Sequence, residues 1–184
     1  MEKLFIVGDV EATGPNCMKH NMYQFGYVPM LTDGTIFPGK AIDLLFRTKY
    51  HYGPTLAFLK RDLGLTPEIL QARPTAIKPK LAIEMFADDI SDLMKTTSTK
   101  EVVYVSDNLA FDWKYMDFYC WMYLGENPLG YAGRDIPSIS MGMYDSRGIW
   151  ERYRTEDHTH GGLEDARGNA GALAQMIKDG LKLS

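Results

Sequence analysis

This sequence has few of the residues that build metal clusters or disulfide frameworks. Among 184 residues there are two cysteines and four histidines. Cys17 and Cys120 are isolated, and neither a Cys-x2-Cys nor a His-x3-His pair occurs, which excludes an ordinary zinc site and a disulfide scaffold. With two cysteines and no signal peptide, we expect an intracellular, cytoplasmic protein with reduced thiols.

Long apolar runs and an excess of basic residues are missing as well. No run approaches the roughly 20 apolar residues that a membrane-spanning helix needs, so no membrane partner is expected. The 20 Lys and Arg against 24 Asp and Glu give a net charge of −4, which argues against a protein that grips nucleic acid through a basic surface alone. Repeats and low-complexity stretches are also lacking. We therefore expect a single domain over residues 1–184, whose 45% hydrophobic content can fill one sizeable core.

Hydrophobic periodicity and turn residues predict a mixed α/β chain. A buried strand is followed by a hairpin that turns at Thr32-Asp33-Gly34, then by a helical stretch, another strand and two more helices. The predicted strands cover residues 4–9, 22–31, 35–45 and 102–106. The predicted helices cover residues 54–63, 79–94 and 112–124, and a last helix begins at residue 163.

The first strand runs straight into two carboxylates. Side chains alternate along a strand, so Asp9 and Glu11 point to the same face. Two carboxylates side by side repel each other unless cations lie between them, and hard divalent ions prefer oxygen ligands of this kind. This pair is therefore a candidate metal site.

A third carboxylate follows the strand at residues 102–106. Asp112 lies where this strand gives way to an aromatic-rich helix, and active sites are commonly built at such sheet edges. An alternative is that Asp112 only caps the helix.

The last acidic segment combines a histidine with a carboxylate. His160 precedes a glycine pair, which allows a loop to bend freely before the final helix, and Asp165 falls in the first turns of that helix. Apolar side chains recur through this helix at helical spacing: Leu163, Ala166, Ala170, Leu173, Ile177 and Leu181.

Taken in order, these segments resemble the motifs of the DEDDh 3′-to-5′ exonucleases, the DnaQ-like group of the ribonuclease H-like superfamily. The stretch from Asp9 to Gly14 is similar to the first motif, that from Asn108 to Asp112 to the second, and that from His160 to Asp165 to the third. The related tyrosine branch has a tyrosine four positions before the last aspartate, where this chain has Gly161. The histidine branch is the better match.

The resemblance implies a ribonuclease H-like mixed sheet, with three antiparallel strands plus parallel strands, flanked by helices. It also implies two divalent ions, Mg²⁺ or Mn²⁺, which lower the barrier to phosphodiester hydrolysis. By similarity, Asp9 bridges both ions, Glu11 and Asp165 complete the first, and Asp112 anchors the second. His160 is then the general base, since histidine exchanges protons near neutral pH. His158 is the alternative base, and the motif spacing favours His160.

The chain also departs from the family pattern. Gln24 stands where a carboxylate is common in the second strand, and Asp107 stands where bacterial proofreading relatives often have histidine. Residues 128–153 match no relative. We expect Thr13, Gly14 and Asn108 to contact substrate.

Two aromatic segments each allow two interpretations. Trp150 and Tyr153 alternate with arginines, which suits either a strand-gripping patch or a surface segment with its aromatics packed inward. The arginines are Arg147, Arg152 and Arg154. The aromatic helix from Trp113 to Tyr123 offers either stacking platforms or, as we favour, core side chains.

The favoured hypothesis is a metal-dependent exonuclease that trims single-stranded nucleic acid from a free 3′ end and releases nucleoside 5′-monophosphates. RNA is slightly favoured over DNA, because the chain carries neither a polymerase nor a partner-binding tail. A homodimer is expected only by analogy with small stand-alone relatives. The alternatives are a ribonuclease H-like endonuclease and a non-catalytic nucleic-acid-binding module.

Overall fold

The structure is a computed structural model, which describes residues 3–182. In chain order its elements are β1 (Lys3–Ala12), β2 (Met22–Leu31), β3 (Lys40–Asp43), α1 (Gly53–Asp62), α2 (Pro67–Ala72), α3 (Pro79–Thr97), β4 (Glu101–Ser106), α4 (Leu109–Leu124), β5 (Gly133–Asp135), α5 (Ile136–Tyr144), the 3₁₀ helix η1 (Ile149–Tyr153) and α6 (Gly162–Lys178). Within residues 3–182, no helix has both the length and the apolar character needed to cross a bilayer.

The strands form one mixed sheet in the order β3-β2-β1-β4-β5. β1 pairs antiparallel with β2, and β2 pairs antiparallel with β3. β4 runs parallel to β1, and β5 runs parallel to β4. Three antiparallel strands plus parallel strands is the predicted ribonuclease H-like arrangement, and that prediction is confirmed.

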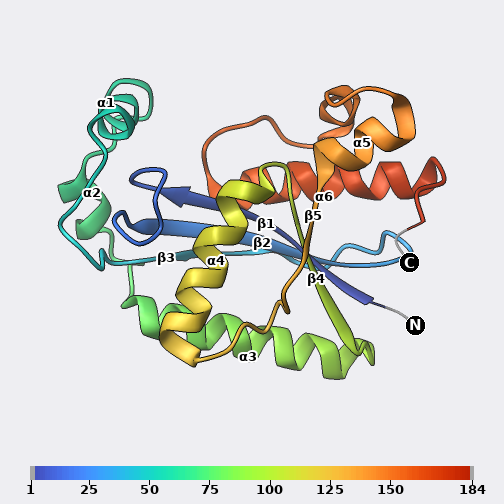
Figure 1. The fold of residues 1–184 in the computed structure, drawn as a ribbon, viewed down its shortest axis with the longest axis horizontal. Coiled ribbons are helices and arrows are strands. Elements are labelled where there is room, and N and C mark those ends of the chain that lie inside the picture. Colours follow the sequence, from blue (N-terminus) through green and yellow to red (C-terminus); the bar gives the residue numbers. More distant parts are fainter. Residues whose placement is uncertain (1–2, 183–184) are drawn as a thin grey trace.

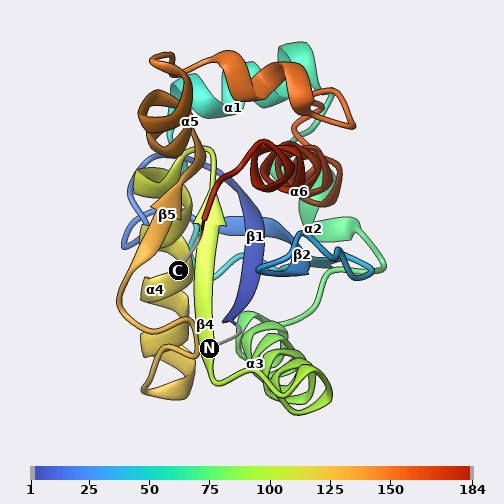
Figure 2. The same ribbon diagram turned by 90° about the vertical axis from the view of Figure 1, so that its right-hand side faces the viewer.

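Helices cover both faces of this sheet, because the side chains of β1 alternate between two cores. Leu4, Ile6 and Val10 pack with α3 and α4. Phe5 and Val7 point the other way and pack with α6 and with residues from the segment of α5 and η1. Figure 2 shows β1 and β4 between α4 and α6, and Figure 1 shows α3 and α4 together on one side. The buried aromatics of α4, Tyr115 and Tyr119, confirm our preference for core packing in that helix.

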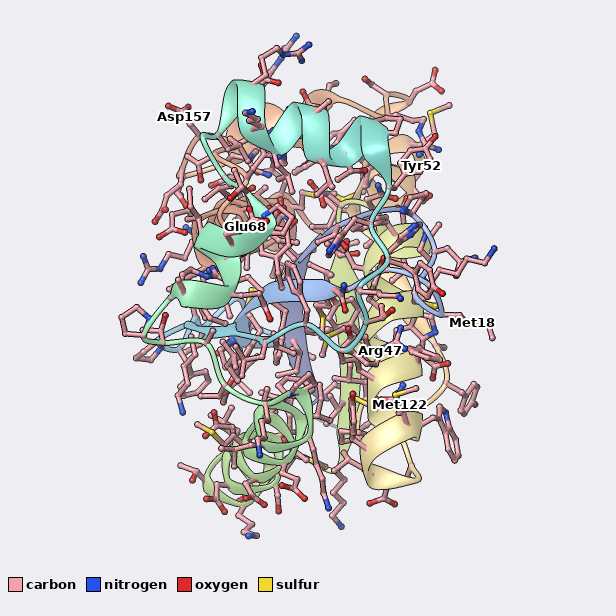
Figure 3. The ribbon with its side chains drawn as sticks, turned by 90° about the vertical axis from the view of Figure 1, so that its left-hand side faces the viewer. Met18, Arg47, Tyr52, Glu68, Met122 and Asp157 are labelled. Carbon is pink, nitrogen blue, oxygen red and sulfur yellow. The ribbon has the colours of Figure 1, made fainter. Side chains whose placement is uncertain are left out.

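α1 and α2 lie apart from the two main helical layers, at one end of the sheet (Figures 1 and 3). Figure 3 labels Tyr52 at the start of α1 and Glu68 on α2. A small apolar cluster attaches both helices, with Leu59 of α1 and Leu70 of α2 packing with Tyr23 of β2. This arrangement places one face of α1 over the carboxyl ends of β1 and β4.

Several predicted boundaries differ from the structure. The predicted strand at residues 35–45 is only β3, because Pro38 lacks an N–H and residues 35–39 contribute no more than an isolated bridge at Ile36. α4 begins at Leu109, three residues before the predicted start, so Asp112 lies in its first turn. α2, β5, α5 and η1 were not predicted, and three of them fall within residues 128–153, where no family pattern gave guidance.

Candidate active site

A cleft of about 340 Å³ lies at the carboxyl ends of β1 and β4. Carboxyl ends of parallel strands meet at one edge of a sheet, where ligand sites are commonly built. α1 forms one wall of this open cleft through Thr55, Phe58 and Leu59. Its lining residues are Asp9, Val10, Glu11, Ala12, Thr55, Phe58, Leu59, Asp107, Asn108, Phe111, Asp112, His158 and His160.

Asp9 and Glu11 project from β1 toward this cleft, as strand alternation predicts. A carboxylate oxygen of each lies within 4.8 Å of the other and of a ligand oxygen of Asp165. Glu11 also accepts a hydrogen bond from the Tyr23 hydroxyl, 3.2 Å away. The first and third acidic segments, more than 150 positions apart in the sequence, therefore meet at one point.

Asp112 is held against β1. Its Oδ1 accepts a hydrogen bond from the backbone N–H of Val10 over 3.1 Å. In α4 its own N–H donates to the carbonyl of Asn108, which occupies the N-cap position. The alternative of Asp112 as a helix cap is therefore wrong, since this side chain joins α4 to β1. Its Oδ2 is buried and has no hydrogen-bond partner among residues 3–182.

Asp165 is fully buried and organises the loop before α6. Its Oδ1 accepts hydrogen bonds from Thr159 N at 2.9 Å and from Arg154 Nη2 at 3.1 Å, and its Oδ2 accepts one from His160 N at 2.9 Å. Both oxygens of Asp165 therefore accept hydrogen bonds from the backbone of the loop that contains His160. A carboxylate oxygen has two lone pairs, so these bonds occupy both lone pairs of Oδ1 and leave one on Oδ2 for a cation.

The two loop histidines both face the cleft. The His160 ring packs edge-on against the Phe58 ring of α1, with 5.1 Å between the ring centroids. The centroid of the His158 ring lies 4.5 Å from that of the His160 ring. His158 Nδ1 is 3.5 Å from Asp165 Oδ1. His160 has a φ of 57°, a left-handed conformation that is uncommon for residues other than glycine. The geometry brings both candidate bases to the same cleft.

Burial and mutual repulsion disfavour the charged form of these carboxyl groups. Burial raises the pKa of Asp9 well above its usual range, and the charges of Asp112 and Glu11 raise it further. Burial raises the pKa of Glu11 to about 8, although the Tyr23 hydrogen bond opposes this shift. Burial also raises the pKa of Asp112 to about 8, with the charge of Asp107 adding to it. Such groups hold either protons or cations at neutral pH.

The residues fit divalent metal ions. Ligand atoms of Asp9, Glu11 and Asp165 lie within 4.8 Å of one another, and so do those of Asp9, Asp107 and Asp112. Asp9 belongs to both groups. Hard carboxylate oxygens and the unpartnered Asp112 Oδ2 suit Mg²⁺ or Mn²⁺. A third group, His158, His160 and Asp165, shares Asp165 with the first.

Sequence reasoning missed the part that Arg154 plays in this site. Its guanidinium is only 9% exposed and lies 5.7 Å from the Trp150 ring. Trp150 is buried, whereas Arg147 and Arg152 are exposed. Of the two interpretations of this segment, the one with its aromatics packed inward is therefore correct for Trp150. Arg154 also points inward. Its contact with Asp165 links residues on different elements, and no sequence pattern signals such a pair.

Asp107 was noted only as a departure from the family pattern. It lies in the site, with a ligand atom within 4.8 Å of those of Asp9 and Asp112. The sequence feature that could have indicated its role is its position directly after β4, the strand whose carboxyl end borders the cleft.

The three predicted substrate-binding residues lie in different surroundings. Asn108 lines the cleft. Thr13 is buried, and its hydroxyl accepts a hydrogen bond from Asn21 N over 3.0 Å. Gly14 packs so tightly that a Cβ there would come within 2.6 Å of His20 and Tyr52 atoms. In this structure Thr13 and Gly14 shape the loop after β1, and neither is among the residues lining the cleft.

Comparisons with known proteins agree with this geometry. No protein-family model matches the chain. The chain is 27% identical over 184 residues to the 3′-5′ DNA exonuclease Cap18 of Escherichia coli, a match that covers 90% of this chain and 87% of that protein. The chain resembles the DnaQ-like 3′-to-5′ exonucleases. The resemblance expected from the motifs is confirmed, as is the enzyme class, 3′-to-5′ exonuclease.

Solved structures of exonucleases have the same fold. A full-length 3′-exonuclease superimposes with a TM-score of 0.66 at 20% identity, covering 99% of this chain and 84% of that chain. Zinc-bound Escherichia coli exonuclease I in complex with single-stranded DNA superimposes with a TM-score of 0.67 at 15% identity, covering 97% of this chain. The chain spans only 40% of the length of that exonuclease I chain.

Proposed function

We propose that this protein is a metal-dependent 3′-to-5′ exonuclease that removes nucleotides from the 3′ end of single-stranded DNA. The observation that carries the proposal is the place of Asp9 in two adjacent groups of ligand oxygens, one completed by Glu11 and Asp165 and the other including Asp112. Two neighbouring divalent ions sharing one carboxylate suit phosphodiester hydrolysis. The exonuclease relatives support the same conclusion.

DNA is the substrate that the relatives favour. The curated relative is named a DNA exonuclease, and one neighbouring structure contains single-stranded DNA. The slight preference for RNA rested only on what the sequence lacks, and no comparison supports it. The homodimer likewise stays a prediction.

In this proposal the carboxylates divide between two ions. Asp9, Glu11 and Asp165 would hold the first, and Asp9 with Asp112 would hold the second. Bound there, the ions supply an activated water and stabilise charge on the phosphate and the leaving oxygen. His160 accepts a proton at the cleft, which it lines together with these acids. His158 points to the same place and is the alternative acceptor.

The apolar side of the cleft suits the terminal nucleotide. Phe58 and Leu59 of α1 and Phe111 of α4 line the same cleft as the acids. Aromatic side chains stack on every base, so such a wall holds a nucleotide with little sequence preference. A cleft of about 340 Å³ is small, which suits engagement of one chain end.

A time course on matched 5′-labelled DNA and RNA oligonucleotides tests the proposal. Each is incubated with Mg²⁺, Mn²⁺ or EDTA, with its 3′ hydroxyl free or blocked, and Asp9→Asn serves as the inactive control. We expect a metal-dependent ladder that shortens from free 3′ ends, faster on DNA. Internal cuts indifferent to the block would indicate an endonuclease. Binding without cleavage would indicate a nucleic-acid-binding module.

A further inference from the structure

Asp107 brings a fifth carboxylate to the site. It follows β4 directly and lines both the cleft and a neighbouring cavity of about 420 Å³. One of its oxygens lies within 4.8 Å of ligand oxygens of Asp9 and Asp112. Opposite ligands on an octahedral Mg²⁺ with 2.0–2.1 Å bonds are roughly 4.2 Å apart. Two of the three carboxylates could therefore bind opposite each other with little movement, and the third would take an adjacent position, closer to both.

The buried oxygen of Asp112 independently indicates a cation at this point. Asp112 is 2% exposed, and only its Oδ1 is bonded, to Val10 N. Within residues 3–182 Oδ2 has no hydrogen bond of ordinary geometry, and the Ser106 hydroxyl, which approaches this carboxylate and opposes the rise that burial causes in its pKa, is itself buried without a partner. An unpaired carboxylate oxygen in the interior is costly, and a cation beside it removes that cost. Asp112 and Asp107 belong to the same group of ligand oxygens, so one ion would serve both.

Arg154 compensates for the additional negative charge. Its Nη1 lies 3.8 Å from Asp107 Oδ2, and its Nη2 lies 3.1 Å from Asp165 Oδ1. The same guanidinium donates to Asn169 Oδ1 and to the carbonyl of Glu156, so its orientation is fixed. With two divalent ions bound, the five carboxylates of the site face five positive charges, one of them on Arg154.

The Arg154 guanidinium packs directly against Gly168 of α6. A Cβ on Gly168 of α6 would lie 2.8 Å from Arg154 Nη2, so a larger residue there would push the guanidinium aside. The pair with Asp107 is longer than the hydrogen-bonded pair with Asp165. Asp107 is therefore held less closely by Arg154 than Asp165 is. The Asn169 side chain also approaches Asp107.

We propose that Asp107 is a third carboxylate ligand of the second divalent ion, beside Asp9 and Asp112, and that Arg154 is the positioning residue that orients Asp107 and Asp165. The inference rests on the proposed two-metal function. A second ion with three carboxylates is held more tightly than one with two, so the enzyme saturates with metal at a lower concentration. Loss of Asp107 weakens the second ion and leaves the first in place.

Counting bound Mn²⁺ tests this inference without relying on activity. Free Mn²⁺ is followed by electron paramagnetic resonance as the full-length protein is titrated. Asp107→Asn is compared with wild type and with Asp112→Asn. The matched control is Asp157→Asn, which removes the same charge from an exposed position on the rim of the neighbouring cavity. Melting curves confirm that each variant folds, and Asp107→Ser is a second variant at the same position.

We expect two Mn²⁺ sites in wild type and in Asp157→Asn. In Asp107→Asn the second site should weaken by at least roughly 10–100-fold, since that is the range for losing only an outer-shell partner of a metal ligand. Exonuclease rates in that variant should recover at high Mn²⁺, because only the affinity for the metal has changed. If Asp107→Asn binds both ions like wild type while Asp112→Asn loses one, the role of Asp107 is overturned and the two-metal function stands. If wild type binds no Mn²⁺, both proposals are wrong.

Discussion

The side-chain oxygen of Gln24 accepts a hydrogen bond from the backbone N–H of Gly162 over 2.8 Å, which ties β2 to the first turn of α6. The Gln24 Nε2 donates to Asp43 Oδ1, also over 2.8 Å. An amide both accepts and donates, and a carboxylate would only accept. This explains the neutral residue at a position where related enzymes often have an acid.

The substitution Gln24→Glu should destabilise the protein. The introduced carboxylate would keep the bond from Gly162 but lose the bond to Asp43 and place two like charges together. We expect the free energy of unfolding to fall by about 1–3 kcal/mol, as when a buried polar contact is lost. Urea denaturation at neutral and at acid pH measures this. Most of the loss should disappear at acid pH, where the carboxyl groups are neutral, and an equal loss at both pH values would contradict the explanation.

Gly26 should tolerate no side chain, because a Cβ there would lie 2.1 Å from the backbone of Gly162. We expect Gly26→Ala to lower the free energy of unfolding by about 3 kcal/mol, near the top of the usual range for overpacking. Gly142 is the matched control, since it lies in α5 and a Cβ there meets nothing within 4 Å. Gly142→Ala should stabilise by about 0.5–1 kcal/mol. Thermal melts of both variants test the pair, and equal melting temperatures would contradict this account.

The stability of the metal-free protein should fall as pH rises. The pKa of Glu11 is raised from 4.5 to about 8 and that of Asp112 from 3.8 to about 8. A raised pKa means that the folded state binds protons more tightly than the unfolded state, so the stabilisation is complete at low pH and is lost between pH 4 and pH 8. Each kcal/mol lost lowers the melting temperature by about 2–4 °C in a chain of this size.

Divalent metal should remove this dependence, because cations stabilise the ionised carboxylates. Thermal melts across that pH range, with EDTA or with Mg²⁺, provide the test. A melting temperature in EDTA that rises toward pH 8 would reverse the sign we expect. Asp9→Asn, which removes one of the repelling charges, should raise the melting temperature in EDTA while abolishing activity.

His160→Ala should lower the exonuclease rate constant by about 10²–10⁴-fold, the usual range for loss of a general base. Binding of oligonucleotide should change little, because the carboxylates remain. His158→Ala is the matched comparison, since both histidines line the cleft. Single-turnover rates measured across pH distinguish the two. A larger loss in His158→Ala would transfer the role of base to His158.

Arg154→Met should weaken metal binding and leave the fold less stable. It removes the hydrogen bond to the fully buried Asp165, which costs about 3–5 kcal/mol when one partner of a buried ion pair is lost. Arg154→Lys keeps the charge but not the forked geometry, and it should restore only part of the stability. Melts with and without Mn²⁺, together with the metal concentration for half-maximal rate, measure both effects. A purely structural role would leave that concentration unchanged.

Much of the site followed from local sequence. Asp9 and Glu11 share a face because strand side chains alternate, and Asp112 and Asp165 follow their strand and loop at recognisable spacings. Those are short-range features, which a sequence displays directly. The long helices and β1, β2 and β4 were predicted for the same reason, since each carries a periodic pattern over many residues.

Other features depend on residues far apart in the chain. The bond from Val10 to Asp112 joins positions 102 residues apart, and that from Gly162 to Gln24 joins positions 138 apart. Local pattern carries no information about such pairs. β5 has only three residues, too few for periodicity to identify it.

The sequence by itself determined the four motif carboxylates, the two candidate histidines and the order of the main strands and helices. Only the tertiary structure decided that Arg154 turns inward to Asp165, that Gln24 holds the start of α6, and that Asp107 joins Asp9 and Asp112. The physical reason is that the residue type at each position fixes the chemistry of its side chain. The charges that surround it in the fold come from every element that packs against it.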